Sequence, residues 1–293
     1  TPESTNPVIT AGGTLTYTEN GSAAVIDNSI TITDADDIEF SGANLTISSS
    51  FTTGDILTIV TQNGISGSFN SSTGVLTISG TATLANYQIA LRTITYNSNS
   101  EDPTVTSSTR TIGWVVTDAN SEGLGAKTST AETSTIILTP INDLPVVTAG
   151  ATLSYTENGS AEVIDATIAI SDLYDTQLSS ASLTISSGFT DGDILTLATQ
   201  NGISGAYDST AGVLTISGTT SLANYVTALR SITYHSTSVD PTLTSSSRTI
   251  TWEVTDANSD GAGAANSSGV TSTINITALS DAPVVTAGST LSY

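Results

Sequence analysis

The feature that most constrains this chain is a repeat of 138 residues without insertion or deletion. Residues 7–144 align with residues 145–282 without a gap, and a P-V-[IV]-T-A-G run opens at Pro7, Pro145 and Pro283. A fixed period is the signature of an array of like modules, and this one is long enough to bury a core. We therefore expect a first repeat in residues 1–144, a second in 145–282, and the first strand of a truncated third in 283–293.

Apolar periodicity predicts an all-β fold. Apolar and hydroxyl residues alternate through 14–17 and 30–33, as in half-buried strands, and the longer apolar run at 54–61 predicts a central strand. Leu84, Tyr87 and Leu91 recur instead at helical spacing behind a Thr83 N-cap. The sequence therefore predicts tandem antiparallel β-sandwiches with Greek-key connections and one short helix per repeat.

Composition excludes several classes of function. The net charge is −22 with only five Lys and Arg residues, which argues against binding to nucleic acid or to anionic membranes. No apolar stretch approaches the ~20 residues of a membrane span, and the absence of Cys excludes disulfides and thiolate metal sites. The single histidine, His235, corresponds to Asn97 in the first repeat, so we expect no enzyme with a shared imidazole mechanism.

The acidic residues are expected at the two ends of each sandwich. If the strands run alternately down and up, the loops at 34–37 and 118–120 share one end, which we name the N-terminal pole. The turn at 18–20 and the loop at 97–103 share the other, the C-terminal pole. The candidate residues of repeat 1 are Asp34, Asp36 and Asp118 at the N-terminal pole, and Glu19 and Asp102 at the C-terminal pole. Those of repeat 2 are Asp172, Asp175 and Asp256, and Glu157 and Asp240.

The segment between the repeats adds further oxygen ligands. It reads T-P-I-N-D-L-P, with Asn142 and Asp143 between two prolines. Stacked repeats would bring five or six carboxylates together, and these repel one another unless a cation lies among them. Six to eight hard oxygen ligands favour Ca²⁺ over Mg²⁺, so a calcium-stiffened joint is predicted. The alternative is that such acids are solvated turn formers, which we expect for Asp27, Asp55, Asp165 and Asp193.

These motifs also carry a family resemblance. T-E-N in the first turn, D-A-D after the second strand, T-D-A-N after the penultimate strand and N-D-x-P in the linker resemble the calcium motifs of cadherin repeats. The runs N-G-I-S-G, T-G-V-L-T-I-S-G and L-A-N-Y look more specifically like the cadherin-like extender modules of giant bacterial surface adhesins of the RTX or Bap type. The resemblance implies a cadherin-like or Ig-like fold and assigns calcium ligands to Glu19, Glu157, Asp34, Asp36, Asp118, Asp256, Asn142 and Asp143.

The sequence departs from this pattern at three places. Repeat 2 has Tyr174 in place of the second Asp of D-A-D, so either Asp175 substitutes or one ion is absent. At the C-terminal junction Asp281, the counterpart of Asp143, follows Ser280 rather than Asn, and before repeat 1 the corresponding residue is Thr5. We expect the outer sites to be only partly formed.

These observations lead to one principal functional hypothesis. It is a calcium-rigidified spacer of a large secreted bacterial adhesin, a monomeric rod on the cell surface whose partners are neighbouring repeats. Such a rod would project a distal binding domain in cell adhesion or biofilm formation. The alternative is a module that itself binds a glycan or a protein. Trp114 and Trp252 are expected to be core residues, and the arginines at 92, 110, 230 and 248 to form ion pairs that cap the core.

Overall fold

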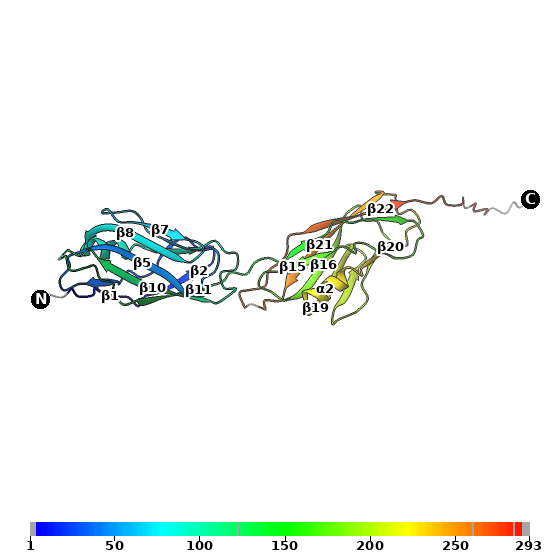
Figure 1. Cartoon of the computed structure of the whole chain (residues 1–293). Helices are drawn as coiled ribbons and strands as arrows, with labels where there is room; N and C mark the ends of the chain where they lie inside the picture. The colour runs from blue at the N-terminus through cyan, green and yellow to red at the C-terminus, as the bar shows by residue number, and fades with distance from the viewer. Residues whose placement is uncertain (1–3, 122, 260, 284, 289–293) are drawn as a thin grey trace, which may run out of the picture. The chain divides into compact units, whose positions relative to one another are not determined.

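The computed structural model describes residues 4–121, 123–259, 261–283 and 285–288. The chain divides into two compact units, Thr1–Ile141 and Asn142–Tyr293 (Figure 1). In the sequence, the division between them falls three residues before the boundary of the repeat. Of the predicted third-repeat strand, 284 and 289–293 lie outside the described residues. Pro283 and residues 285–288 are not part of a strand.

Unit 1 is a β-sandwich. Its larger sheet has the strand order β2-β11-β10-β5-β8-β7, and the remaining strands form the sheets β3-β9-β6 and β1-β4. All pairs are antiparallel except β2 with β11, which is parallel. The strands are β1 (Val8–Thr10), β2 (Thr14–Thr18), β3 (Ala24–Val25), β4 (Thr31–Thr33), β5 (Glu39–Ser49), β6 (Asp55–Thr58), β7 (Ser66–Asn70), β8 (Val75–Thr83), β9 (Thr95–Ser98), β10 (Thr109–Asp118) and β11 (Glu132–Thr139).

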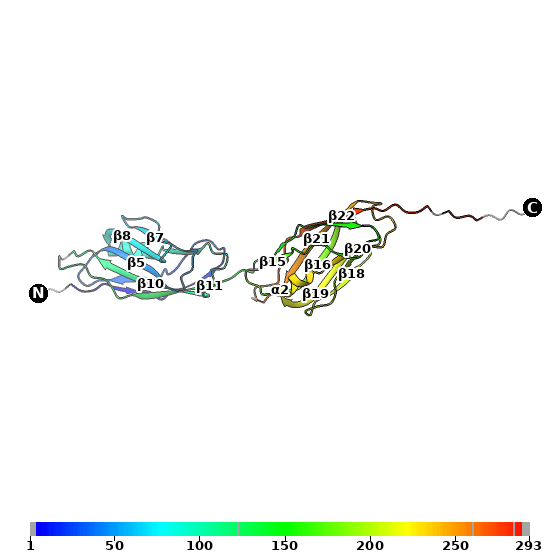
Figure 2. The same ribbon diagram turned by 45° about the vertical axis from the view of Figure 1, so that its right-hand side comes forward.

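Unit 2 repeats this topology strand for strand. The order of its larger sheet is β13-β22-β21-β16-β19-β18, with β18 at the edge beside β19 (Figure 2). Its strands are β12 (Val146–Thr148), β13 (Thr152–Thr156), β14 (Glu162–Val163), β15 (Ala169–Ser171), β16 (Gln177–Ser187), β17 (Asp193–Thr196), β18 (Ser204–Asp208), β19 (Val213–Ser221), β20 (Thr233–Ser236), β21 (Ser247–Asp256) and β22 (Val270–Thr277). Both units confirm the predicted all-β class.

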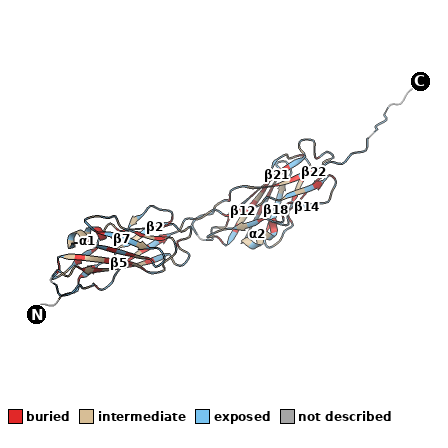
Figure 3. Ribbon diagram, turned by 45° about the horizontal axis from the view of Figure 1, so that its top comes forward, coloured by how far each residue is buried: buried red, intermediate tan, exposed pale blue. Residues whose placement is uncertain are grey.

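Each unit has its own apolar core, which the strands build from alternate residues (Figure 3). Trp114 and Trp252 are fully buried, as predicted, and each indole N–H donates to a buried serine hydroxyl at 3.0 Å, Ser134 and Ser272 respectively. The indole N–H would otherwise be an unsatisfied donor in the core, so each serine allows a tryptophan to be buried completely.

The predicted short helices are present as α1 (Leu84–Leu91) and α2 (Leu222–Leu229). Thr83 Oγ1 accepts a hydrogen bond from the Asn86 N–H at 3.3 Å, which confirms the predicted N-cap. At the other end of α1, Arg92 Nε donates to the Ile30 carbonyl at 2.7 Å. Arg92 and its counterpart Arg230 thus cap main-chain carbonyls, whereas the ion pairs of the described residues belong to Arg110 and Arg248.

Two expectations about the strands and their acids are wrong. The run at 54–61 forms only the short strand β6, at the edge of a three-stranded sheet. Asp55 and Leu57 are buried while the side chains between and after them are not, so only one face of the strand packs on the core. Asp55 and Asp193 are not solvated turn formers. Each is 1% exposed and forms an ion pair, with Arg110 and Arg248 respectively.

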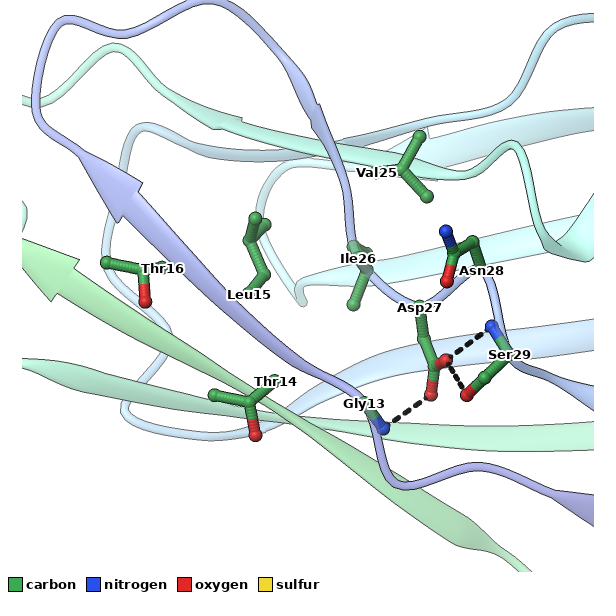
Figure 4. Close-up of a pocket in the computed structure, with 9 residues that line it drawn as sticks. All are labelled: Gly13, Thr14, Leu15, Thr16, Val25, Ile26, Asp27, Asn28 and Ser29. Atoms are coloured by element: carbon green, nitrogen blue, oxygen red, sulfur yellow. Dashed lines mark hydrogen bonds between the residues drawn. The ribbon is translucent and has the colours of Figure 1, made fainter.

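Asp27 is also buried rather than solvated. Its carboxylate accepts hydrogen bonds from the N–H groups of Gly12, Gly13 and Ser29 and from the hydroxyls of Ser29 and Ser134, at 2.6–3.1 Å. Figure 4 shows those from Gly13 and Ser29. Burial acts to raise the pKa of Asp27, but these hydrogen bonds outweigh burial and hold the pKa well below its usual value. Asp165 repeats the arrangement in unit 2, so this carboxylate fastens the crossover between the first two strands of each repeat.

Candidate metal site at the repeat poles

Three carboxylates meet at the N-terminal pole of unit 2. Asp172 and Asp175 lie in the loop after β15, Asp256 ends β21, and one oxygen of each lies within 4.8 Å of the others. Asp172 Oδ1 accepts the main-chain N–H groups of Tyr174 and Asp175 at 3.1 and 2.8 Å, which folds the loop back on itself. Asp175 Oδ1 accepts hydrogen bonds from Ser259 of the neighbouring loop. The two loops are therefore joined around the acids.

The second oxygens of two of these carboxylates lack protein partners. Asp172 Oδ2 and Asp175 Oδ2 are both buried without a hydrogen bond, and Asp175 is only 2% exposed. A desolvated carboxylate oxygen without a donor destabilises the folded state unless something positive compensates for the lost water. Oxygens of this kind, close to a third carboxylate, are what a bound cation would satisfy.

The linker residue Asn142 joins the same group. Its Nδ2 donates to Asp256 Oδ2 at 3.0 Å and to the Gly263 carbonyl, which leaves Oδ1 buried without a partner. The donor set is therefore composed of carboxylate and amide oxygens only. Such hard ligands fit Ca²⁺, which takes six to eight oxygens in flexible geometry, better than they fit a transition metal.

The electrostatics of this pole agree with its geometry. Burial raises the pKa of Asp172 above its ordinary value, and the charges of Asp175 and Asp256 raise it further, against the hydrogen bonds from the main chain that lower it. Without a counter-charge, the ionised form of Asp172 is thus less favourable here than in water. A divalent cation would reverse this effect.

The N-terminal pole of unit 1 collects a different set. Asp34, Asp36 and Asp37 each have an oxygen within 4.8 Å of the others, and Asp36 accepts hydrogen bonds from the N–H and hydroxyl of Thr5. Asp118 is not in this group, although its two oxygens accept the N–H groups of Asn120 and Lys127 just as those of Asp256 accept the N–H groups of Asn258 and Ala265. The predicted residues at 34 and 36 are therefore brought together, and the one at 118 is not.

The sequence prediction omitted Asp37. This residue is buried, and its Oδ1 accepts the Ser121 N–H at 2.7 Å, as Asp175 accepts from Ser259 in unit 2. Asp175 was among the predicted residues, and Asp37 occupies the same register position 138 residues earlier. The repeat itself thus held the signal that could have found it.

The C-terminal poles are organised around a buried glutamate. Glu19 Oε2 accepts the Ile141 N–H at 2.9 Å, and Glu157 Oε2 accepts the Leu279 N–H at 2.7 Å, so each glutamate holds the chain that leaves its repeat. Both glutamates are at most 3% exposed, and Glu157 Oε1 is buried without a partner. Asp102 and Asp240 each close their own turn, through hydrogen bonds from Thr104 and Thr242. Asp143 is half-buried in the linker and Asp281 is exposed.

Comparisons with known proteins give distant similarity only. No family model matches the chain. A segment of 102 residues is 36% identical to part of halomucin of Haloquadratum walsbyi. The match covers 33% of this chain and 1% of halomucin. Similar solved structures are the cadherin domains of protocadherin gamma B2 (13% identity, 94% of this chain and 41% of that one, TM-score 0.39), Drosophila N-cadherin (10%, 94% and 50%, 0.37) and human protocadherin-24 (10%, 91% and 95%, 0.34).

In the part of the chain that the structure describes, no helix is both long and apolar enough to cross a bilayer.

Proposed function

We propose that this chain is a spacer from an extracellular adhesion protein on a bacterial cell surface, in which calcium stiffens the joint between consecutive repeats. In this proposal the ion is held by the N-terminal pole of one repeat together with the linker that precedes it. Without calcium the acids repel one another and the joint is flexible. With calcium the repeats form a rod that projects a distal binding domain, in cell adhesion or biofilm formation.

The observation that carries the proposal is the set of unpartnered buried oxygens at Asp172, Asp175 and Asn142. Two of them come from a pole and one from the linker, so an ion bound to all three would restrain the linker relative to the repeat. Two adjacent linker residues are bonded to different repeats. The Ile141 N–H donates to Glu19 of repeat 1, and the Asn142 side chain donates to Asp256 of repeat 2. A linker with so few free residues needs only a small further restraint to become stiff.

Small-angle scattering with calcium and with a chelator tests the proposal directly. We expect a larger maximum dimension and less interdomain flexibility in calcium, together with a higher melting temperature. A ligand present at 100 times its dissociation constant stabilises by about 2.7 kcal/mol. Equal dimensions and equal flexibility in both conditions would contradict the mechanism.

Matched variants test the residues. Asp172→Asn and Asp143→Thr should abolish the calcium-dependent part of the melting temperature. Asp191→Asn, which changes an exposed acid in the loop between β16 and β17, outside the acidic group of the N-terminal pole, should not. Repeat 1 combines Thr5 with Asp36 where repeat 2 combines Asp143 with Tyr174. Adding Tyr174→Asp to Asp143→Thr should therefore restore calcium-dependent stabilisation, and a double variant that stays insensitive to calcium would exclude Asp143 as a contributor of charge.

A further inference from the structure

A fully buried arginine organises the loop at the C-terminal pole of unit 1. Arg110 is completely inaccessible to solvent, and its guanidinium donates to Asp55 through Nε at 2.7 Å and Nη2 at 3.4 Å. Nη2 also donates to the Pro103 carbonyl at 2.6 Å, and Nη1 to the carbonyls of Ser107 and Thr109 at 2.8 and 3.2 Å. All five N–H groups of the guanidinium are therefore used, three of them on main-chain carbonyls.

The same arrangement recurs in unit 2 with nearly the same dimensions. Arg248 is fully buried and donates to Asp193 at 2.6 and 3.3 Å, to the Pro241 carbonyl at 2.6 Å, and to the carbonyls of Ser245 and Ser247 at 2.8 and 3.3 Å. Two loops that differ in sequence, S-E-D-P-T-V-T and S-V-D-P-T-L-T, are thus held by identical contacts.

A chain of buried contacts leads from this ion pair to the other segment of the pole. Asp55 Oδ1 accepts the Tyr96 hydroxyl at 2.6 Å, and the Tyr96 ring packs edge to face on Tyr17, with centroids 5.0 Å apart. The Tyr17 hydroxyl donates to the Gly21 carbonyl at 2.7 Å and accepts the Ser98 N–H at 3.3 Å. The network therefore connects the start of the loop after β9 with the turn that carries Glu19.

Stability alone gives little reason for such a network. Burying an ion pair removes two charges from water, and apolar residues of similar size often serve a core equally well. What apolar residues cannot do is bind two carbonyls of the loop at 99–108, which contains no strand of its own, together with a third at the start of β10. A planar guanidinium with donors in fixed directions suits that task.

We infer that Arg110 and Arg248 are positioning residues, which hold the acidic loop and the glutamate turn of each C-terminal pole in place before any ion binds. Asp55, Tyr96 and Tyr17 extend their effect to the turn at 18–21, and Asp193, Tyr234 and Tyr155 do the same in unit 2. The consequence for metal binding rests on the proposed calcium function. The consequence for the shape of the pole does not.

The test compares three variants of the full chain in chelator. Arg110→Lys keeps a charge opposite Asp55 but loses the fork to the carbonyls, and Tyr17→Phe removes one hydroxyl and leaves the core shape intact. Asp27→Asn is the matched control, since Asp27 is buried and hydrogen-bonded but has no contact with this network. Amide hydrogen exchange is measured along each chain, with unit 2 as the internal reference.

We expect exchange to rise at least tenfold in residues 99–108 for Arg110→Lys and in residues 18–21 for Tyr17→Phe, with neither segment singled out in Asp27→Asn. The glutamate turn holds the start of the linker, through the Ile141 N–H, and the linker carries Asn142 of the proposed calcium site. Calcium affinity, measured by titration calorimetry, should therefore fall about tenfold in Arg110→Lys, as is typical when a group that orients metal ligands is removed. Unchanged exchange in both segments, or an equal rise in the control, overturns the inference. If Arg110→Lys does not fold, Tyr17→Phe still decides. If the unaltered chain binds no calcium, the proposed function fails and the exchange result stands by itself.

Discussion

Removing the carboxylate of Asp55 should destabilise repeat 1 strongly. In Asp55→Ala the guanidinium of Arg110 stays completely buried, because its position is fixed by three main-chain carbonyls, but its negative partner is gone. The Tyr96 hydroxyl and the Thr52 N–H lose their acceptor as well. An uncompensated charge in the core is one of the few single changes that produce a large loss of stability.

The size of the loss follows from the burial of the pair. Breaking a buried ion pair by removing one partner costs about 3–5 kcal/mol. A domain the size of one repeat has an unfolding entropy of roughly 0.3 kcal/mol/K near its midpoint, so the melting temperature of repeat 1 should fall by roughly 10–17 °C. Replacing both partners together, as Asp55→Leu with Arg110→Met, should recover most of this loss, because no buried charge remains.

Differential scanning calorimetry of the full chain measures the effect, and the second repeat provides the reference. Asp55→Ala should lower the transition of repeat 1 alone, and Asp193→Ala, its counterpart 138 residues later, should lower that of repeat 2 alone. Asp191→Ala removes an exposed carboxylate two residues from Asp193 and should change stability by no more than about 0.5 kcal/mol. A loss below about 1 kcal/mol in Asp55→Ala would refute the reasoning, because it would mean that the arginine charge is not confined to the core.

Three further changes test other parts of the fold. Asp27→Asn should cost about 1.5–3 kcal/mol at pH 7, since the folded state holds the pKa of Asp27 down. This contribution is present above pH ~4 and is lost as the pH falls through the folded pKa, so urea midpoints of variant and wild type should converge in acid. Gly218→Ala should destabilise repeat 2 by about 1–3 kcal/mol or more in urea titrations, because the residue has φ +134° and its new Cβ would lie 2.1 Å from the Gly202 carbonyl oxygen. Thr83→Ala should cost about 1 kcal/mol in thermal unfolding, as the N-cap of α1 is lost.

Local patterns predicted most of the fold because they depend on neighbours in the sequence. Strand alternation, the helix spacing behind Thr83 and the inward position of Trp114 are all confirmed. The position of the run at 54–61 was wrong because a short apolar run looks alike at the centre and at the edge of a sheet. A central strand and an edge strand are distinguished only by the number of neighbouring strands, and β6 has one, β9.

The buried acids could not be predicted for a related reason. The sequence predicted that Arg110 forms an ion pair that caps the core, but it did not say which acid would be the partner, and Asp55 lies 55 residues away. Asp27 depends on Ser134, at a separation of 107 residues. Both were assigned to solvated turns because Asp favours turns by default. In the structure each carboxylate does close a local turn, and the distant partners account for its burial.

The poles were accessible from the sequence because strand parity alone determines which loops share an end. What parity could not give was the exact membership of each acidic group, which depends on where single side chains go. Asp118 and Asp256 both accept two main-chain N–H groups of their own loops, but only Asp256 belongs to a group of three acids, with Asp172 and Asp175. The residue that precedes each pole also differs. Asn142 donates to Asp256 before repeat 2, and the corresponding residue before repeat 1 is Ser4.

The repeats also differ in where the remaining acid of the pole comes from. In repeat 1 the loop supplies Asp36, which accepts two hydrogen bonds from Thr5, so these two positions adjoin. In repeat 2 the loop position holds Tyr174 and the acid stands at the linker position, as Asp143. Solvated turn formers would be free to vary one at a time. Here each repeat keeps one acid at these two positions, at one position in repeat 1 and at the other in repeat 2. This exchange is expected when the negative charge of the pole must be kept, as it must for a site that holds a divalent cation.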